Sequence, residues 1–162
     1  MILHHAKGND YAFLFDCFED LTVLNSSTNP TEIDFYQIKS KDTSGNWTVN
    51  SLVKSTKEKS SIVAKMYSNK LLFPKCTKSL IFISNARFSF KDLSDGSKSL
   101  SRSEIKGSEM DLLDKNKINT KIKDQLSLGT NPIFENYSGF LVTILSSKDL
   151  SLIHISEPTR PY

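Results

Sequence analysis

The chain has 162 residues, of which 38% are hydrophobic and 24% are charged, so its composition predicts a folded domain with its own core rather than a disordered segment. The net charge of +3 is a mild basic excess, which is compatible with a polyanionic partner and equally typical of a solvated, lysine-rich protein. No apolar stretch is long enough to span a membrane and no secretory signal is visible, so we expect no membrane partner and a cytoplasmic location. The cysteines and histidines show no zinc-ligand spacing.

The first quarter of the chain predicts three strands joined as a β-meander. Residues 11–18 are an aromatic run that predicts a strand buried on both faces, with Cys17 as a small core residue. Residues 21–24 predict a second strand. The segment 25–32, rich in Asn, Ser and Pro, predicts a turn before a third strand over 33–40.

A helix is expected to follow the meander. Asn50 or Ser51 is placed to cap it, and its apolar pattern extends to about Asn69. Its polar side carries three lysines on one face: Lys54, Lys57 and Lys65. A solvated helix face is the ordinary reading of such a stripe, and contact with phosphate is the functional alternative.

The second half of the chain predicts two more strands and one more helix. Residues 79–84 are a buried strand, and 91–109 are typical of an exposed excursion. Asp114 is expected to cap a helix that ends near Gly129, and 139–145 predict the last strand. The resulting order, β-β-β-α-β-α-β, predicts a single α/β layered domain.

Both ends of the chain are expected to depart from a natural domain. Residues 150–160 look like translated sequencing adapter, so we interpret 150–162 as an artefactual tail, with a natural tail as the alternative. Residues 1–8 are typical of the end of a helix. We therefore expect a domain over 1–149 that is truncated at both ends.

The third predicted strand carries two polar groups in its middle, Gln37 and Lys39. Residues two apart on a strand share a face, so this amide and this ammonium project together. If the preceding hairpin brings Asp20 to the neighbouring strand, a carboxylate joins them. The ordinary alternative is a lysine whose head reaches water and a glutamine that bonds to the backbone.

A carboxylate, an amide and an ammonium have a joint chemistry. Carboxylate and amide oxygens suit Mg²⁺, with Mn²⁺ as the alternative ion. A metal there can acidify a bound water and polarise a phosphodiester, while a lysine orients the water or offsets developing charge. The pattern is therefore compatible with phosphodiester hydrolysis.

Beyond these residues, the chain resembles a known family over about residues 9–90. Five stretches carry the resemblance in order and spacing: FDCFEDLTVL, IDFYQIKSK, GNWTVNSLVKS, SIVAKMYSN and SLIFISNARF. They resemble the DNA endonuclease domain of CD-NTase-associated (CBASS anti-phage) effectors, a branch of the PD-(D/E)XK restriction-endonuclease-like superfamily. The resemblance implies an α/β core in which a β-meander and helix–strand units form a central mixed sheet flanked by helices.

The resemblance also implies a function, a metal-dependent double-stranded DNA endonuclease of an anti-phage effector. Asp20 corresponds to the motif aspartate, Gln37 stands where the superfamily has an acid, and Lys39 is the motif lysine. Asp20 and Gln37 would hold the metal, with Asp16 and Glu19 as further ligands or supporting groups. Four cations would contact DNA phosphates: Lys54, Lys57, Lys65 and Arg87.

In this family the nuclease is joined to a C-terminal cyclic-oligonucleotide sensor, and ligand-driven assembly turns on cleavage. We therefore expect such a sensor in the full protein and expect it to form a homo-oligomer. Two alternatives remain: a non-catalytic nucleic-acid-binding module of the same fold, and an inert fragment.

Overall fold

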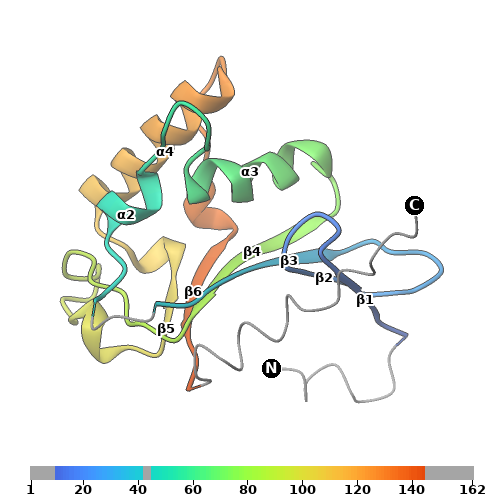
Figure 1. Cartoon of the computed structure of the whole chain (residues 1–162), viewed down its shortest axis with the longest axis horizontal. Coiled ribbons are helices and arrows are strands. Elements are labelled where there is room, and N and C mark those ends of the chain that lie inside the picture. The colour runs from blue at the N-terminus through green and yellow to red at the C-terminus, as the bar shows by residue number, and fades with distance from the viewer. Residues whose placement is uncertain (1–9, 42–44, 145–162) are drawn as a thin grey trace.

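The computed structural model describes residues 10–41 and 45–144. In these residues one mixed sheet has the spatial order β1 (Ala12–Phe15), β2 (Leu21–Leu24), β3 (Ile33–Lys39), β4 (Thr77–Ser84), β6 (Ser138–Val142) and β5 (Glu104–Lys106) (Figure 1). The helices of the described residues lie together over one face of this sheet: α2 (Val49–Val53), α3 (Ile62–Leu72) and α4 (Leu112–Leu126) (Figure 1). The predicted α/β, restriction-endonuclease-like fold is confirmed.

Two predictions fall on the ends of the chain. The helix end expected at 1–8 and the tail expected at 150–162 lie outside the described residues, and both stay predictions. The domain boundary at 149 lies there too.

The first three strands form the predicted meander. β1 pairs with β2 and β2 pairs with β3, both antiparallel. Asn25 closes the second turn, because its Oδ1 accepts the backbone N–H groups of Thr31 (2.9 Å) and Glu32 (3.0 Å). The prediction that the first strand is buried on both faces is wrong: β1 is an edge strand, and Phe13 and Phe15 on one of its sides are exposed.

The centre of the sheet is parallel. β3 pairs with β4 and β4 pairs with β6, both in parallel, so each connection must cross over the sheet. The helices α2 and α3 fill the first crossover, and α4 lies in the second. The short β5 closes the far edge, antiparallel to β6. The strands predicted at 79–84 and 139–145 are present as β4 and β6; residue 145 itself lies outside the described residues.

The structure contradicts the single helix predicted from Asn50 or Ser51 to Asn69. α2 ends at Val53, because the next residue, Lys54, has an extended backbone with a φ of −63° and a ψ of 131°. A new helix, α3, starts after Ser61, whose side chain accepts the backbone N–H of the third helical residue. The connection between them is rich in Ser and Thr, whose hydroxyl groups compete with helical hydrogen bonding, and one such side chain caps a tight turn there.

Helix caps also differ from the predictions. The cap of α2 is Thr48, which forms a capping box with Ser51. The cap of α4 is Asp111 and not Asp114. Asp114 is instead buried, and its carboxylate accepts the backbone N–H of Lys91. α4 ends on a left-handed residue two positions before Gly129. At both helix starts the sequence offers more than one capping residue within three positions, whereas the predicted end of α4 near Gly129 is confirmed.

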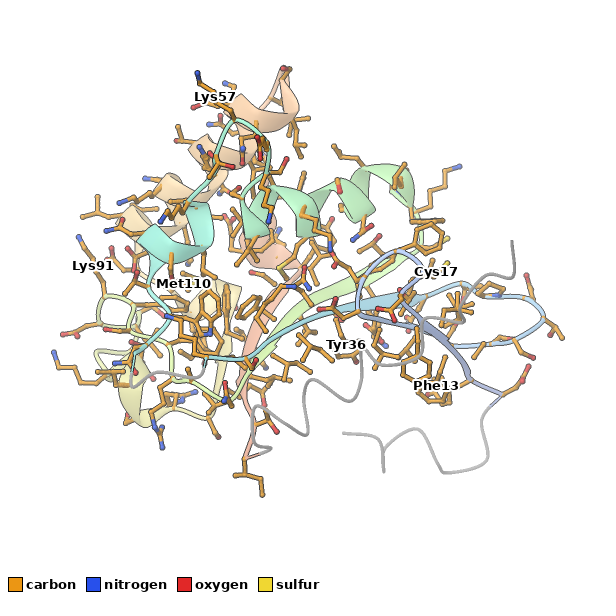
Figure 2. All side chains as sticks on the ribbon, viewed as in Figure 1. Phe13, Cys17, Tyr36, Lys57, Lys91 and Met110 are labelled. Atoms are coloured by element: carbon orange, nitrogen blue, oxygen red, sulfur yellow. The ribbon has the colours of Figure 1, made fainter. Side chains whose placement is uncertain are left out.

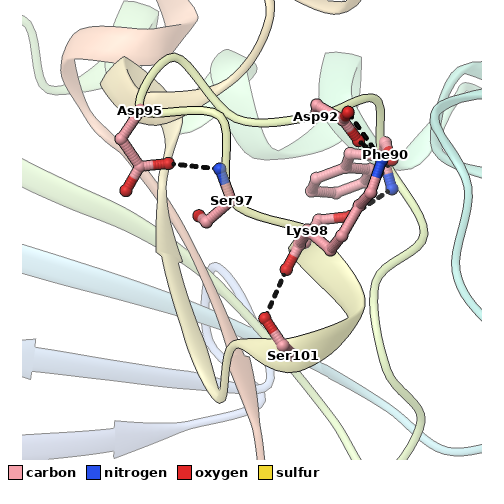
Figure 3. Close-up of polar contacts among 7 residues, drawn as sticks. Phe90, Asp92, Asp95, Ser97, Lys98 and Ser101 are labelled. Atoms are coloured by element: carbon pink, nitrogen blue, oxygen red, sulfur yellow. Dashed lines mark hydrogen bonds and ion pairs between the residues drawn. The ribbon is translucent and has the colours of Figure 1, made fainter.

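The prediction of an exposed excursion over 91–109 is wrong in part. This segment contributes β5 and buries two apolar side chains, Leu93 and Ile105. Its turn is fixed by local polar contacts (Figure 3). Asp95 accepts the backbone N–H of Ser97 (2.9 Å), and Lys98 pairs with Asp92 (2.6 Å). The polar residues of this segment therefore form a hydrogen-bonded surface turn, and its buried apolar side chains attach the turn to the core.

The core lies between the sheet and the helices. Phe35 of β3 is 1% exposed, and the buried rings of Phe82 and Phe88 meet edge to face with centroids 5.7 Å apart. Cys17 was predicted in this core, and that prediction is wrong: it is exposed in the loop between β1 and β2 (Figure 2). The first strand therefore ends at Phe15, three residues before the predicted end at residue 18.

Candidate active site

The register of the meander brings Asp20 to Gln37. Leu21, at the start of β2, pairs with Tyr36 of β3, so in an antiparallel ladder the preceding residue meets residue 37. The Gln37 side-chain amide, through Nε2, donates to Asp20 Oδ2, and the backbone N–H of Ile38 donates to the same oxygen (2.5 Å). Both side chains are buried. The predicted meeting of this carboxylate and this amide is thus present in the structure.

The other end of the same amide faces the helix α3. Gln37 Oε1 accepts a hydrogen bond from Lys65 Nζ at 3.2 Å. That ammonium also lies 3.0 Å from Glu19 Oε2 as an ion pair. Glu19 Oε1 in turn accepts from Asn69 Nδ2 at 3.0 Å. We call Glu19, Asp20, Gln37, Lys65 and Asn69 the acidic cluster.

Helix α3 contributes two members of the acidic cluster. Lys65 and Asn69 are four residues apart, so they share one face of the helix. Val63 and Met66, both at most 2% exposed, anchor the helix against the core. The ends of the two side chains therefore reach the hairpin from a rigid element.

Burial dominates the electrostatics of Glu19. Its side chain is fully buried, which raises the pKa of this carboxyl above its ordinary value, while the charge of Lys65 opposes that rise. The neighbouring charge of Asp20 raises it further. Oε2 accepts no well-aligned hydrogen bond in the described part of the chain, so the ion pair is its main compensation.

Lys39 occupies a different place from the other cluster members. It lies two positions beyond Gln37 on β3 and so on the same face of the strand, next to Ser84 of β4. Lys39 is half-buried. Within the described residues, 10–41 and 45–144, its side chain has no hydrogen bond or ion pair. The ammonium that contacts Gln37 in this structure belongs to Lys65.

Asp16 lies apart from these contacts. It is exposed in the turn between β1 and β2, with a φ of 51°, a left-handed conformation that Asp tolerates better than most residues. Its backbone N–H donates to the carbonyl of Asp20 at 3.4 Å. The structure thus gives it a role in the hairpin that presents Asp20.

The four predicted DNA-contacting cations do not form one stripe, because the helix that was to carry three of them is broken. Lys54 and Lys57 are exposed at the end of α2 and in the connection after it. Lys65 belongs to the acidic cluster. Arg87 is exposed beyond β4, where its guanidinium donates to the carbonyl of Leu100 at 2.9 Å.

The acidic cluster offers donors that suit a hard cation. In the described residues no group of three or more His, Cys, Asp or Glu is placed to hold a metal. Mg²⁺, however, keeps several waters and needs only one or two carboxylates. Asp20, Glu19 and the amide of Gln37 supply such a set, and the buried Oε2 of Glu19, which has an ion pair but no well-aligned hydrogen bond among the described residues, is the kind of atom that a cation satisfies. Half a turn of the amide would present Oε1 toward Asp20.

Sequence reasoning missed Asn69 and the true position of Lys65. Asn69 is 4% exposed and holds Glu19 from the side opposite the ammonium. A signal existed: a lysine and an asparagine four apart on an otherwise apolar helix face point to one buried polar neighbour.

Comparison with known proteins gives one match. The family described as Cap4, dsDNA endonuclease domain, matches residues 1–156, which include every described residue. No curated protein and no solved structure matches the chain. Among the described residues, no helix is long and apolar enough to cross a membrane.

Proposed function

We propose that this chain, which belongs to the Cap4 dsDNA endonuclease domain family, hydrolyses the phosphodiester backbone of double-stranded DNA with a divalent ion held at Asp20 and Gln37. The observation that carries the proposal is the contact between these two side chains, made where the residue before β2 meets β3 and away from bulk water. Mg²⁺ is the expected ion and Mn²⁺ the alternative, since both prefer oxygen ligands.

Each side chain has a separate task in this proposal. When bound, the ion would lower the pKa of a water and polarise a phosphate oxygen. Asp20 supplies fixed negative charge, held in place by the backbone N–H of Ile38. Lys39, on the same face of β3, orients the attacking water or offsets charge on the phosphate. Glu19 Oε2 supplies a further carboxylate oxygen to the ion, and Asn69 holds the Glu19 side chain in place through its other oxygen.

The family membership supports the wider setting of the activity. We infer a role in bacterial anti-phage defence, in the cytoplasm, with cleavage controlled by a C-terminal sensor for a cyclic oligonucleotide and by assembly of several copies. Lys54, Lys57 and Arg87, all exposed, would add sequence-independent, salt-sensitive contacts to DNA phosphates.

Plasmid cleavage tests the proposal. The full chain is incubated with supercoiled plasmid in Mg²⁺ or in EDTA, and nicked and linear products are followed on a gel. We expect cleavage only with the metal, and a loss of about 10²–10³-fold in Lys39→Ala, the usual effect of removing one charge-stabilising group. Lys91→Ala removes an exposed lysine that lies outside the acidic cluster, next to Asp114 of α4, and is the matched control (Figure 2).

Two results would overturn the proposal. Cleavage that persists in EDTA would exclude metal dependence. DNA binding with no cleavage under any condition would favour the non-catalytic module.

A further inference from the structure

Lys65 of α3 places its ammonium against two oxygens of the acidic cluster. Its ammonium is held by two oxygens of different kinds, the carboxylate Oε2 of Glu19 at 3.0 Å and the amide Oε1 of Gln37 at 3.2 Å. These are the two donor types that suit Mg²⁺. One flexible side chain thus satisfies, from α3, oxygens that the proposed metal would need.

The two partners of this ion pair differ in their freedom to move. The Glu19 side chain is 0% exposed, whereas the Lys65 side chain is 51% exposed. A lysine ammonium is a point charge on a flexible four-carbon stem, so the head of Lys65 can reach water without any movement of α3. Glu19 is fixed in the interior, so loss of Lys65 without a replacement cation would leave a buried carboxylate uncompensated.

From this geometry we infer that Lys65 is a tethered counter-ion that competes with the divalent cation: it occupies the acidic cluster in the metal-free protein and swings into solvent when the metal binds. This inference rests on the metal dependence proposed above and adds a control residue to that site. Lys65 is a positioning residue in this scheme, because it acts through Glu19 and Gln37 rather than on DNA.

Competition predicts a change in metal affinity. An ammonium that fills the position in about nine of ten molecules lowers the apparent affinity for the metal about tenfold. Mn²⁺ binding to the full chain, measured by calorimetry or by the loss of the free-ion EPR signal, should therefore tighten about tenfold in Lys65→Met. Lys91→Met, which removes the same charge outside the acidic cluster, should bind like the wild type.

A second measurement uses the unaltered protein, so it stands even where Lys65→Met fails to fold. The rate at which an amine-reactive ester acylates Lys65 is followed by peptide mass spectrometry, with Lys91 as the internal reference. Release of the ammonium from Glu19 should raise the Lys65 rate when Mn²⁺ is added and leave the Lys91 rate unchanged. A Lys65 rate that falls or stays constant while Mn²⁺ is bound overturns the inference.

The outcomes separate this inference from the proposed function. If the wild type binds Mn²⁺ and Lys65→Met binds it no more tightly than Lys91→Met, competition is wrong and the metal site remains. If no form of the chain binds Mn²⁺, both are wrong. Tighter binding in Lys65→Met together with metal-dependent labelling supports both.

Discussion

Gln37 contacts partners with both ends of its side-chain amide, and this explains why a neutral residue occupies the centre of an acidic cluster. Its Nε2 donates to Asp20 while its Oε1 accepts from Lys65. A carboxylate at position 37 would lie against Asp20 and close to Glu19, three acids in a buried space, which is unfavourable without a metal. The amide keeps the metal-free site stable, and it leaves Asp20 and Glu19 to supply the charge.

Tyr36, the neighbour of Gln37 on the opposite face of β3, gives a prediction about alkaline stability. Burial raises the pKa of its phenol to about 12, helped by the charge of Asp34, against about 10 in the unfolded chain. Between these values the unfolded chain releases the proton and the folded protein keeps it, so stability falls as the pH rises from about 10 to 12.

The loss attributable to Tyr36 is at most about 2.7 kcal/mol, since one pKa unit corresponds to about 1.36 kcal/mol. Tyr36→Phe should remove this component and lose less stability than the wild type over the same interval. Urea unfolding at a series of pH values measures the difference. Parallel pH profiles for the two proteins would show that Tyr36 ionises equally in both states.

At the scale of elements, α3 links the core to the acidic cluster, and Ser61 fixes where it starts. The Ser61 side chain caps the helix at Ala64 and donates to Gln125 of α4, whose Oε1 also accepts the Ser61 backbone N–H at 3.0 Å. Ser61→Ala should therefore lower the free energy of unfolding by about 1–2 kcal/mol. Chemical denaturation measures this loss.

Ser60→Ala is the matched control for Ser61→Ala, because Ser60 precedes Ser61 in the chain and its side chain is exposed. We expect it to change stability little. An equal loss in both variants would mean that general helix propensity, rather than the cap and its contact with α4, positions α3.

The elements also show which parts of the structure the sequence could predict. The meander and the meeting of Asp20 with Gln37 follow from strand alternation and from the pairing of strands that are consecutive in sequence, both local features. The break after α2 depends on hydroxyl groups that compete with helical backbone hydrogen bonds. The apolar spacing takes no account of this competition and therefore predicted one continuous helix. Lys65 was assigned to a solvated stripe because its partners, Glu19 and Gln37, are distant in sequence and become neighbours only when α3 packs on the sheet.

For the molecule as a whole, the site lies where the meander meets the helical layer. The antiparallel hairpin supplies the acids, the parallel crossover supplies α3, and the sheet holds both (Figure 1). The exposed cations are scattered around this centre rather than aligned. We therefore expect DNA affinity to depend on several modest phosphate contacts and to fall with salt.

The most direct test of the account is the Mg²⁺-dependent rate of plasmid cleavage by Asp20→Asn. An asparagine can still accept from the Ile38 backbone, so the fold should persist, as circular dichroism would show. We predict that the rate falls by about a hundredfold or more, because the charge that binds the metal is lost. A folded Asp20→Asn protein that cuts DNA as fast as the wild type would contradict it.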